Sequence, residues 1–252
     1  MQSPTRKKYS RKQITRLSFV FITTVGLSFV ASLVLYVAIL IKQLPSPDQF
    51  GDRKINQSTK LYDRTGAILL YEIHGEEKRT IIPFDQIPGV LKEATLAAED
   101  INFYKSRGFD IKGIARAFLT NLKEGRFAQG GSTITQQLAK NMFLSSERTI
   151  IRKVKELILA IELESKYNKD EIFSLYLNQI PYGSNAYGVE AASQTYFNKS
   201  SKELTLSESA VLASLPRAPS FYSPWGSHLK DLLSRKDYVL DRMAEVGFIT
   251  KE

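Results

Sequence analysis

One uncharged segment constrains this chain more than any other feature. From Leu17 to Ile41 the sequence reads LSFVFITTVGLSFVASLVLYVAILI, without a single charged side chain. About 20 apolar residues in a helix span the hydrocarbon core of a bilayer. The alternative is a cleaved signal peptide, whose apolar stretch runs about 7–15 residues before a small-residue cleavage site. This segment is longer and bulky residues follow it, so we predict an uncleaved signal anchor over residues 17–41.

Basic residues are concentrated just before that segment. Residues 1–16 contain six Lys or Arg and no Asp or Glu, and the rest of the chain is close to neutral although the whole carries +9. Such a tail suits either nucleic acid or a membrane surface. The adjoining apolar segment favours the membrane, so we expect no nucleic-acid partner. The positive-inside rule then predicts a cytoplasmic N-terminus and export of residues 43–252.

Composition excludes several classes of protein. The chain has no Cys and only two His, His74 and His228. It therefore has no disulfide scaffold, thiol nucleophile or Cys-based zinc site. A His-rich metal site is also not expected. With 43% hydrophobic and 24% charged residues, the chain is neither disordered nor collagen-like.

The rest of the chain predicts one exported domain behind a short linker. We assign 1–16 to a cytoplasmic tail, 17–41 to the anchor, 42–56 to the linker and 57–252 to the domain. The pattern of residues 60–71 predicts a β-hairpin whose turn lies at residues 63–66. Residues 78–82 are predicted to form a third strand. Hydrophobic periodicity after Pro83 predicts helices. They cover residues 88–104, a segment from Asp110, 133–141, 149–166, 169–179, 188–196, 205–215 and 228–246. The predicted fold class is mainly α (α+β).

An acidic pair, Glu99 and Asp100, follows a largely apolar helical stretch. Glu99 and Phe103 are four residues apart and share one helix face. A carboxyl group beside apolar surface has a raised proton affinity, which suits general acid or base catalysis. Taken alone, this segment is better explained as a solvated acidic pair near a helix end.

A second segment, residues 130–141, reads GGSTITQQLAKN. Ser132 or Thr133 can cap a helix, and the free N–H groups of a helix start favour anions. Gln137, Lys140 and Asn141 then place polar groups on adjacent turns. An ordinary capped surface helix is the alternative, and the glycine–lysine spacing is not that of a Walker phosphate loop.

A third segment, residues 148–164, combines cations with a central carboxylate. Arg152 and Glu156 are i,i+4 partners, and Lys153 precedes Glu156 by three residues. A carboxylate flanked in this way stays ionised and can fix the cations that clamp a phosphate. A salt-bridged amphipathic helix is the alternative.

Together the three segments resemble the peptidoglycan glycosyltransferase domain of class A penicillin-binding proteins, family 51 of the glycosyltransferases. The resemblance covers nearly all of residues 57–250. Its motifs match Glu99-Asp100-x-x-Phe103 with Gly108 and Asp110, then 130–141, 152–164, 171–188 and 210–224. One departure stands in the first motif, where this chain has Ser106 in place of the family's usual His. Because Glu99 is intact, we interpret Ser106 as a change beside the site.

The resemblance implies a lysozyme-like helical domain with a small lobe that dips into the membrane. The apolar stripe 111–122 and the glycine-bearing loop after it are the candidate for that lobe, unless 111–122 is an ordinary core helix. The implied reaction is polymerisation of lipid II into β-1,4-linked glycan strands with inversion, releasing undecaprenyl diphosphate. The growing chain is the donor and lipid II the acceptor.

The resemblance also assigns roles to residues. Glu99 is the general base on the 4-hydroxyl of the acceptor sugar, and Glu156 holds the diphosphate-binding cations or assists the leaving group. Those cations are Lys140, Arg148, Arg152 and Lys153. The residues implied to shape the sugar and phosphate sites are Asp100, Phe103, Ser132, Thr133, Gln137 and Asn141.

The resemblance implies few further components. A divalent cation such as Mg²⁺ is expected on the substrate diphosphate, with no protein ligand set readable for it and no organic cofactor. The expected partners are lipid II, the glycan chain, the membrane and cell-wall synthesis proteins, which places the chain in the bacterial inner (cytoplasmic) membrane as a single-pass protein. The chain lacks a Lys-Thr-Gly motif, so we expect no transpeptidase activity.

Two other functions compete with this interpretation. A lysozyme-like hydrolase would need no cluster of cations and would favour a second carboxyl group roughly 5–9 Å from the first. A non-catalytic anchored scaffold would not need Glu99 and Glu156. The sequence is either a natural short form or the N-terminal piece of a longer protein. The family's bifunctional proteins continue past a segment like 242–250, which favours the piece.

Overall fold

A computed structural model describes residues 11–45, 58–65, 69–73, 77–106, 108, 131–145, 147 and 149–250. The chain divides into two compact units, Met1–Leu44 and Pro45–Glu252. The finer boundaries at residues 16, 41 and 56 stay predictions. The predicted helix from Asp110, with its apolar stripe 111–122, lies outside the described residues.

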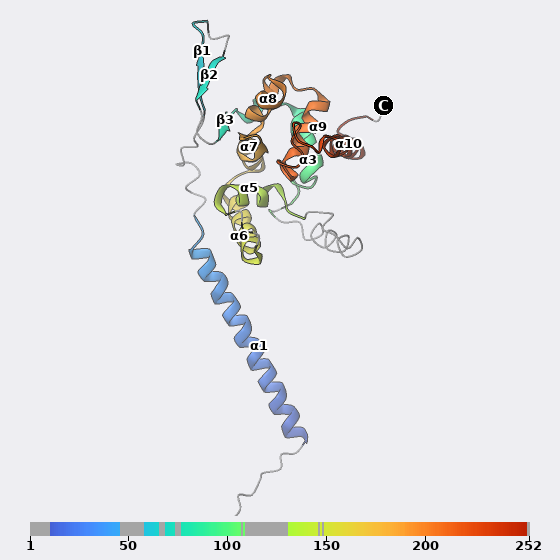
Figure 1. The fold of residues 1–252 in the computed structure, drawn as a ribbon. Helices are drawn as coiled ribbons and strands as arrows, with labels where there is room; N and C mark the ends of the chain where they lie inside the picture. Colours follow the sequence, from blue (N-terminus) through green and yellow to red (C-terminus); the bar gives the residue numbers. More distant parts are fainter. Residues whose placement is uncertain are drawn as a thin grey trace, which may run out of the picture. The chain divides into compact units, whose positions relative to one another are not determined.

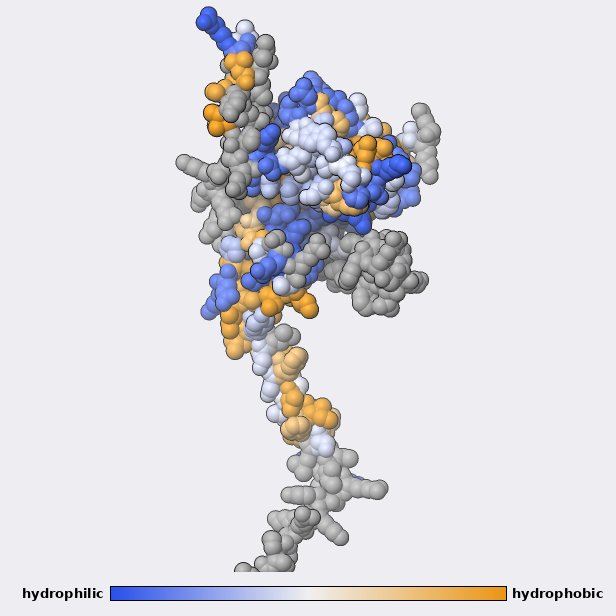
Figure 2. All heavy atoms as spheres, viewed as in Figure 1, coloured by the Kyte–Doolittle hydropathy of each residue, from blue (hydrophilic) through white to orange (hydrophobic). Residues whose placement is uncertain are grey.

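The first unit contains one long helix, α1 (Arg11–Lys42). Its stretch Ser18–Lys42 is long and apolar enough to cross a membrane. Hydrophobic residues run along it in Figure 2. Polar side chains within this stretch bond to the helix itself, as Thr24 shows by donating to the carbonyl of Val20 at 2.7 Å. That arrangement meets the bilayer's requirement that polar groups be satisfied internally, and the predicted N-terminal apolar helix is confirmed.

The second unit is mainly helical, as predicted (Figure 1). Side-chain caps start several helices: Thr133, Thr149, Asn168 and Thr205 each accept a hydrogen bond from a backbone N–H in the first turn. These caps explain why the predicted starts fall within about one residue of the observed ones. The helices are α3 (Gly89–Glu99), α5 (Ile134–Phe143), α6 (Ile150–Lys166), α7 (Lys169–Gln179), α8 (Val189–Phe197), α9 (Leu206–Ser214) and α10 (Leu229–Glu245), with short 3-10 turns η1 (Phe84–Gln86), η2 (Ser201–Glu203) and η3 (Leu215–Arg217).

The prediction for the first of these helices was wrong at its C-terminal end. We expected it to continue to Tyr104, but α3 ends at Glu99 and turns follow. Asp100 takes φ −159° and ψ 86°, and its carboxylate accepts a hydrogen bond from the backbone N–H of Ile134 at 3.2 Å. A contact with a helix start 34 residues later therefore ends α3, and a local pattern does not show such a contact.

The β structure forms two small sheets. β1 (Thr59–Tyr62) and β2 (Leu69–Ile73) pair antiparallel, which confirms the predicted hairpin. The predicted third strand is β3 (Lys78–Arg79), which joins a different sheet, in the order β3-β5-β4, with β4 (Pro181–Gly183) and β5 (Ala186–Tyr187). Gly188 follows β5 with φ +82°, where a Cβ would lie 2.6 Å from the Asn178 carbonyl oxygen. Only glycine permits this close approach.

Two groups of contacts hold the helices around the end of α3. α3 packs against α9 and α10, and the three lie together in Figure 1. Alanines at the centre of this contact, such as Ala94, Ala97 and Ala210, allow close packing of the backbones. α5 packs against both α6 and α7. The end of α3, the start of α5 and the polar side of α6 are therefore held by buried, well-packed surfaces.

Candidate active site

Glu99 is the last residue of α3, and its side chain is only 9% exposed. Its Oε2 accepts a 2.7 Å hydrogen bond from Nε2 of Gln137 on α5. Its Oε1 is buried and has no hydrogen-bond partner among the described residues. One oxygen of this carboxylate is thus bound, and the other is available to accept a proton.

Burial raises the pKa of Glu99 above its ordinary value. Four influences oppose this effect: the hydrogen bond from Gln137 and the charges of Arg235, Arg217 and Lys140. Burial penalises the charged form of a carboxylate, whereas cations and donors stabilise it. The result is a buried carboxylate whose proton affinity is higher than that of a surface glutamate, as a general base requires.

Glu156 is the centre of a second cluster, on α6. It is 3% exposed, and each of its oxygens meets a cation: Oε1 lies 2.5 Å from Nη1 of Arg152, and Oε2 lies 2.9 Å from Nζ of Lys153. Nζ of Lys153 also donates to Ser132 at 2.6 Å and to Gln136 at 3.1 Å. Glu156 therefore fixes two cations, one of which ties α6 to the start of α5.

Lys140 connects the two carboxylates electrostatically. It lies on α5, one turn after Gln137, and no hydrogen bond or ion pair joins its ammonium group to any described residue. Burial lowers its pKa, while the negative charges of Glu156 and Glu99 oppose that change. An ammonium group between these clusters is available for an anionic ligand.

Three of the ten predicted substrate-binding residues have structural contacts around Glu99. Thr133 is buried, caps α5 and donates to the Gly108 carbonyl at 2.9 Å. Asp100 holds the Ile134 N–H. Phe103 is fully buried against Phe173, with ring centroids 5.5 Å apart. In this structure these three side chains stabilise the fold around Glu99 and offer no surface to a ligand.

The other predicted residues are differently placed. Ser132 is partly exposed next to Lys153, and Asn141 is exposed at the C-terminal half of α5. Arg148 lies outside the described residues. The Ser106 hydroxyl donates to the Phe103 carbonyl at 3.2 Å, so it closes the turn after α3.

Comparison with known proteins identifies the family of this chain. Residues 66–244 match the transglycosylase family. The chain belongs to that family. It is 48% identical to penicillin-binding protein 1A of Aquifex aeolicus over 89% of this chain and 30% of that protein. The resemblance inferred from the sequence motifs is thereby confirmed.

Other relatives agree with the first. The domain is 45% identical to penicillin-binding protein 1A of Escherichia coli over 83% of this chain and 24% of that protein. It is 39% identical to penicillin-binding protein 4 of Bacillus subtilis over 83% of this chain and 35% of that protein. The chain thus spans about a third or less of these relatives. A crystal structure of penicillin-binding protein 1A from Haemophilus influenzae matches 79% of this chain and 20% of its own, with 29% identity and a TM-score of 0.42.

Three further side chains belong to this transglycosylase site, although no role was predicted for them from the sequence. Arg235 on α10 reaches to 4.0 Å from Oε1 of Glu99. Tyr176 on α7 donates to Oε1 of Gln137 at 3.3 Å. Gln136 bonds to both Lys153 and the Gly108 carbonyl. No local signal points to Arg235, because its helix is an ordinary amphipathic one and its partner lies far away in the sequence.

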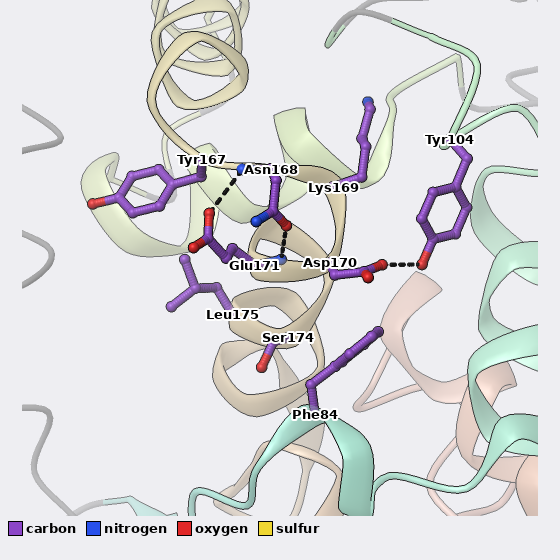
Figure 3. Close-up of a pocket in the computed structure, with 9 residues that line it drawn as sticks. All are labelled: Phe84, Tyr104, Tyr167, Asn168, Lys169, Asp170, Glu171, Ser174 and Leu175. Atoms are coloured by element: carbon purple, nitrogen blue, oxygen red, sulfur yellow. Dashed lines mark hydrogen bonds between the residues drawn. The ribbon is translucent and has the colours of Figure 1, made fainter.

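A separate cavity of about 750 Å³ lies at the N-terminal end of α7 (Figure 3). The hydrogen bond from Tyr104 to Asp170, 2.8 Å long, crosses one side of it, and the Asn168–Glu171 capping box forms another part of the wall. None of the twelve predicted site residues lines it. Its lining residues are Phe84, Tyr104, Tyr167, Asn168, Lys169, Asp170, Glu171, Ser174 and Leu175.

Within the described ranges, no three His, Cys, Asp or Glu side chains gather as a metal site. Glu156 is already engaged by two cations. The described side chains of the transglycosylase site therefore do not form a set that fits a protein-bound divalent cation.

Proposed function

We propose that this transglycosylase domain polymerises lipid II into β-1,4-linked glycan strands with inversion and releases undecaprenyl diphosphate. One observation carries the proposal. The buried carboxylate of Glu99 has one free oxygen and interacts electrostatically with Lys140, and Lys140 also interacts electrostatically with Glu156, which holds Arg152 and Lys153. Glycosyl transfer from a diphosphate needs both a base for the acceptor hydroxyl and positive charge for the leaving group.

Glu99 carries the proton transfer in this proposal. Its Oε1 takes the proton from the 4-hydroxyl of the acceptor sugar, and that oxygen attacks the anomeric carbon of the donor from the face opposite the diphosphate. Gln137 holds Oε2, so the carboxylate cannot rotate without losing a charge-assisted hydrogen bond. Such bonds contribute about 1.5–3 kcal/mol.

Arg152, Lys153 and Lys140 stabilise the leaving diphosphate, whose negative charge grows as the glycosidic bond breaks. Glu156 keeps Arg152 and Lys153 in place before substrate arrives. Positioning these charges in advance avoids reorganisation during the reaction. Ser132, bound to Lys153, and the exposed Asn141 are the predicted ligand contacts with surface accessible next to these cations.

A hydrolase is less well supported by this geometry. Hydrolysis in the lysozyme manner uses a second carboxyl group as nucleophile or base. Both oxygens of Glu156 are occupied by cations, and Asp100 is buried against a helix start. Neither group is free for that role, whereas the cations match a diphosphate.

The anchor and the cation complete the proposal. We propose that α1 crosses the bacterial inner (cytoplasmic) membrane with its N-terminus in the cytoplasm. The site then meets a lipid-linked substrate on the outer side. We further propose that any divalent cation arrives on the substrate diphosphate, since the surrounding Lys and Arg side chains repel a free metal ion. No step above depends on that ion.

The test is incubation of the detergent-solubilised protein with labelled lipid II and Mg²⁺, followed by separation of products by size. We expect long glycan strands whose formation moenomycin, the family's usual inhibitor, blocks. The matched control is Glu99→Gln, which keeps the shape but removes the base and should give no strands with an unchanged unfolding transition. Absence of polymer from folded wild-type protein would contradict the proposed function.

A further inference from the structure

Arg235, on α10, reaches the end of α3 that carries Glu99. Its Nη2 donates to the Ala98 carbonyl at 3.2 Å and lies 4.0 Å from Oε1 of Glu99. The two side chains are 10% and 9% exposed. The guanidinium also lies over the ring of Tyr238, 4.7 Å from its centroid. A cation and an anion are therefore held side by side, largely out of water.

This contact involves the one carboxylate oxygen that Gln137 leaves free. Gln137 bonds to Oε2 of Glu99, and Arg235 approaches Oε1. At 4.0 Å the guanidinium is too far away for a hydrogen bond but close enough for strong charge attraction. Oε1 therefore gains electrostatic stabilisation while its lone pairs stay open.

We propose that Arg235 is a positioning residue for Glu99: its bond to Ala98 fixes the last turn of α3, and its charge keeps Oε1 ionised and open for proton transfer. The inference rests on the proposed function, because it gives Arg235 a part in the same glycosyl transfer. Arginine suits this role, since it keeps its charge when it is buried.

The other groups around Glu99 determine what loss of Arg235 does. Burial raises the pKa of Tyr176 and of Tyr182, so both tyrosines are neutral near pH 7. The remaining cations only partly offset burial of the carboxylate. Without Arg235, the pKa of Glu99 rises further, and the base stays protonated to a higher pH. Besides Arg235, the groups that face Glu99 are Arg217 from η3, Lys140 from α5, Tyr176 from α7 and Tyr182 from β4.

The test compares pH profiles of kcat/KM for lipid II polymerisation in wild type, Arg235→Gln and Arg235→Lys. We expect Arg235→Gln to move the acidic limb upward by about one pH unit or more, which is a tenfold loss below the limb. Activity should recover at high pH and KM should change little. Arg235→Lys should keep the limb in place because it keeps the charge. Arg242→Gln, on an exposed part of the same helix, is the matched control.

Each outcome decides the inference. An unchanged limb in Arg235→Gln, or an equal loss at every pH, would overturn it and leave Arg235 as a packing residue. If Arg235→Gln does not fold, Arg235→Lys decides: several-fold lower kcat at constant KM supports the inference, since the shorter lysine side chain loosens the bond to Ala98 that fixes the last turn of α3, and wild-type kcat overturns it. Polymer from wild type in the same assay separates this result from failure of the proposed function.

Discussion

Gln137 and Glu99 are joined by a 2.7 Å hydrogen bond in which Nε2 donates to Oε2. The amide has no freedom to turn round, because its own oxygen accepts from the Tyr176 hydroxyl at 3.3 Å. Tyr176 is fully buried on α7. A chain of contacts from α7 through α5 thus fixes which oxygen of Glu99 is bound and which remains open.

Replacing Gln137 with Met removes the donor and keeps a side chain of similar length. We expect the pKa of Glu99 to rise, since this hydrogen bond opposes the effect of burial. The carboxylate is then ionised only at higher pH, so the acidic limb of kcat/KM moves upward by about one to two units. The control is Gln194→Met, which removes a similar bond to Glu190 in α8. A uniform loss of activity across pH would contradict the prediction.

Lys140 should contribute to catalysis without contributing to stability. Its ammonium group has no ion pair within the described part of the chain, and burial disfavours its charge. We expect Lys140→Ala to lower kcat by about 10²–10³, the effect of removing one preorganised group at a developing charge. Its unfolding midpoint should stay equal or rise. Lys230→Ala, at an exposed site on α10, is the control, and a stable variant with full activity would exclude Lys140 from the diphosphate site.

Glu156→Gln should weaken both stability and transfer. The change leaves Arg152, whose side chain is only 19% exposed, beside a neutral partner. An unsatisfied buried group costs about 1–3 kcal/mol. We expect a loss of unfolding free energy in that range, measured in urea, together with weaker moenomycin binding. Glu162→Gln on the same helix is the control. Equal stability of the two variants would show that the Arg152–Glu156–Lys153 cluster is not structural.

Local chemistry explains how much of this molecule could be predicted from its sequence. Helix starts are encoded by nearby caps such as Thr149 and Asn168. The i,i+3 and i,i+4 pairs of Glu156 follow from helix geometry, so the sequence alone predicted that cluster. The segment around Glu99, residues 130–141 and residues 148–164 each have an ordinary structural explanation when taken alone. Only their combination favoured a catalytic function.

Contacts between distant segments were the part that could not be predicted. Arg235 and Ala98 are 137 residues apart, and hydrophobic periodicity says nothing about such pairs. The sheet of β3, β4 and β5 has strands of two or three residues, too short for an alternating pattern. Phe103 matched a motif next to Glu99, but only the fold shows that its ring is buried.

The capping box at the start of α7 should stabilise the domain measurably. The Asn168 side chain accepts from the Glu171 N–H at 3.0 Å, and the Glu171 carboxylate accepts from the Asn168 N–H at 2.8 Å. Asn168→Ala should therefore cost about 1 kcal/mol. Asn168→Asp, which keeps the acceptor, is the control and should stay near wild type in thermal unfolding. Equal destabilisation by both variants would contradict a capping role.

The orientation of α1 is the last prediction, and the lack of native cysteines makes it directly testable. Basic residues precede the apolar segment, which should keep residue 3 in the cytoplasm and place residue 227 outside. We therefore compare Ser3→Cys with Ser227→Cys, an exposed position before α10, in cells with a permeabilised envelope but an intact inner membrane. A membrane-impermeant maleimide should label only the cysteine at 227 and should label the one at 3 after lysis. Early labelling at position 3 alone would place the catalytic domain on the cytoplasmic side, away from an externally displayed lipid substrate.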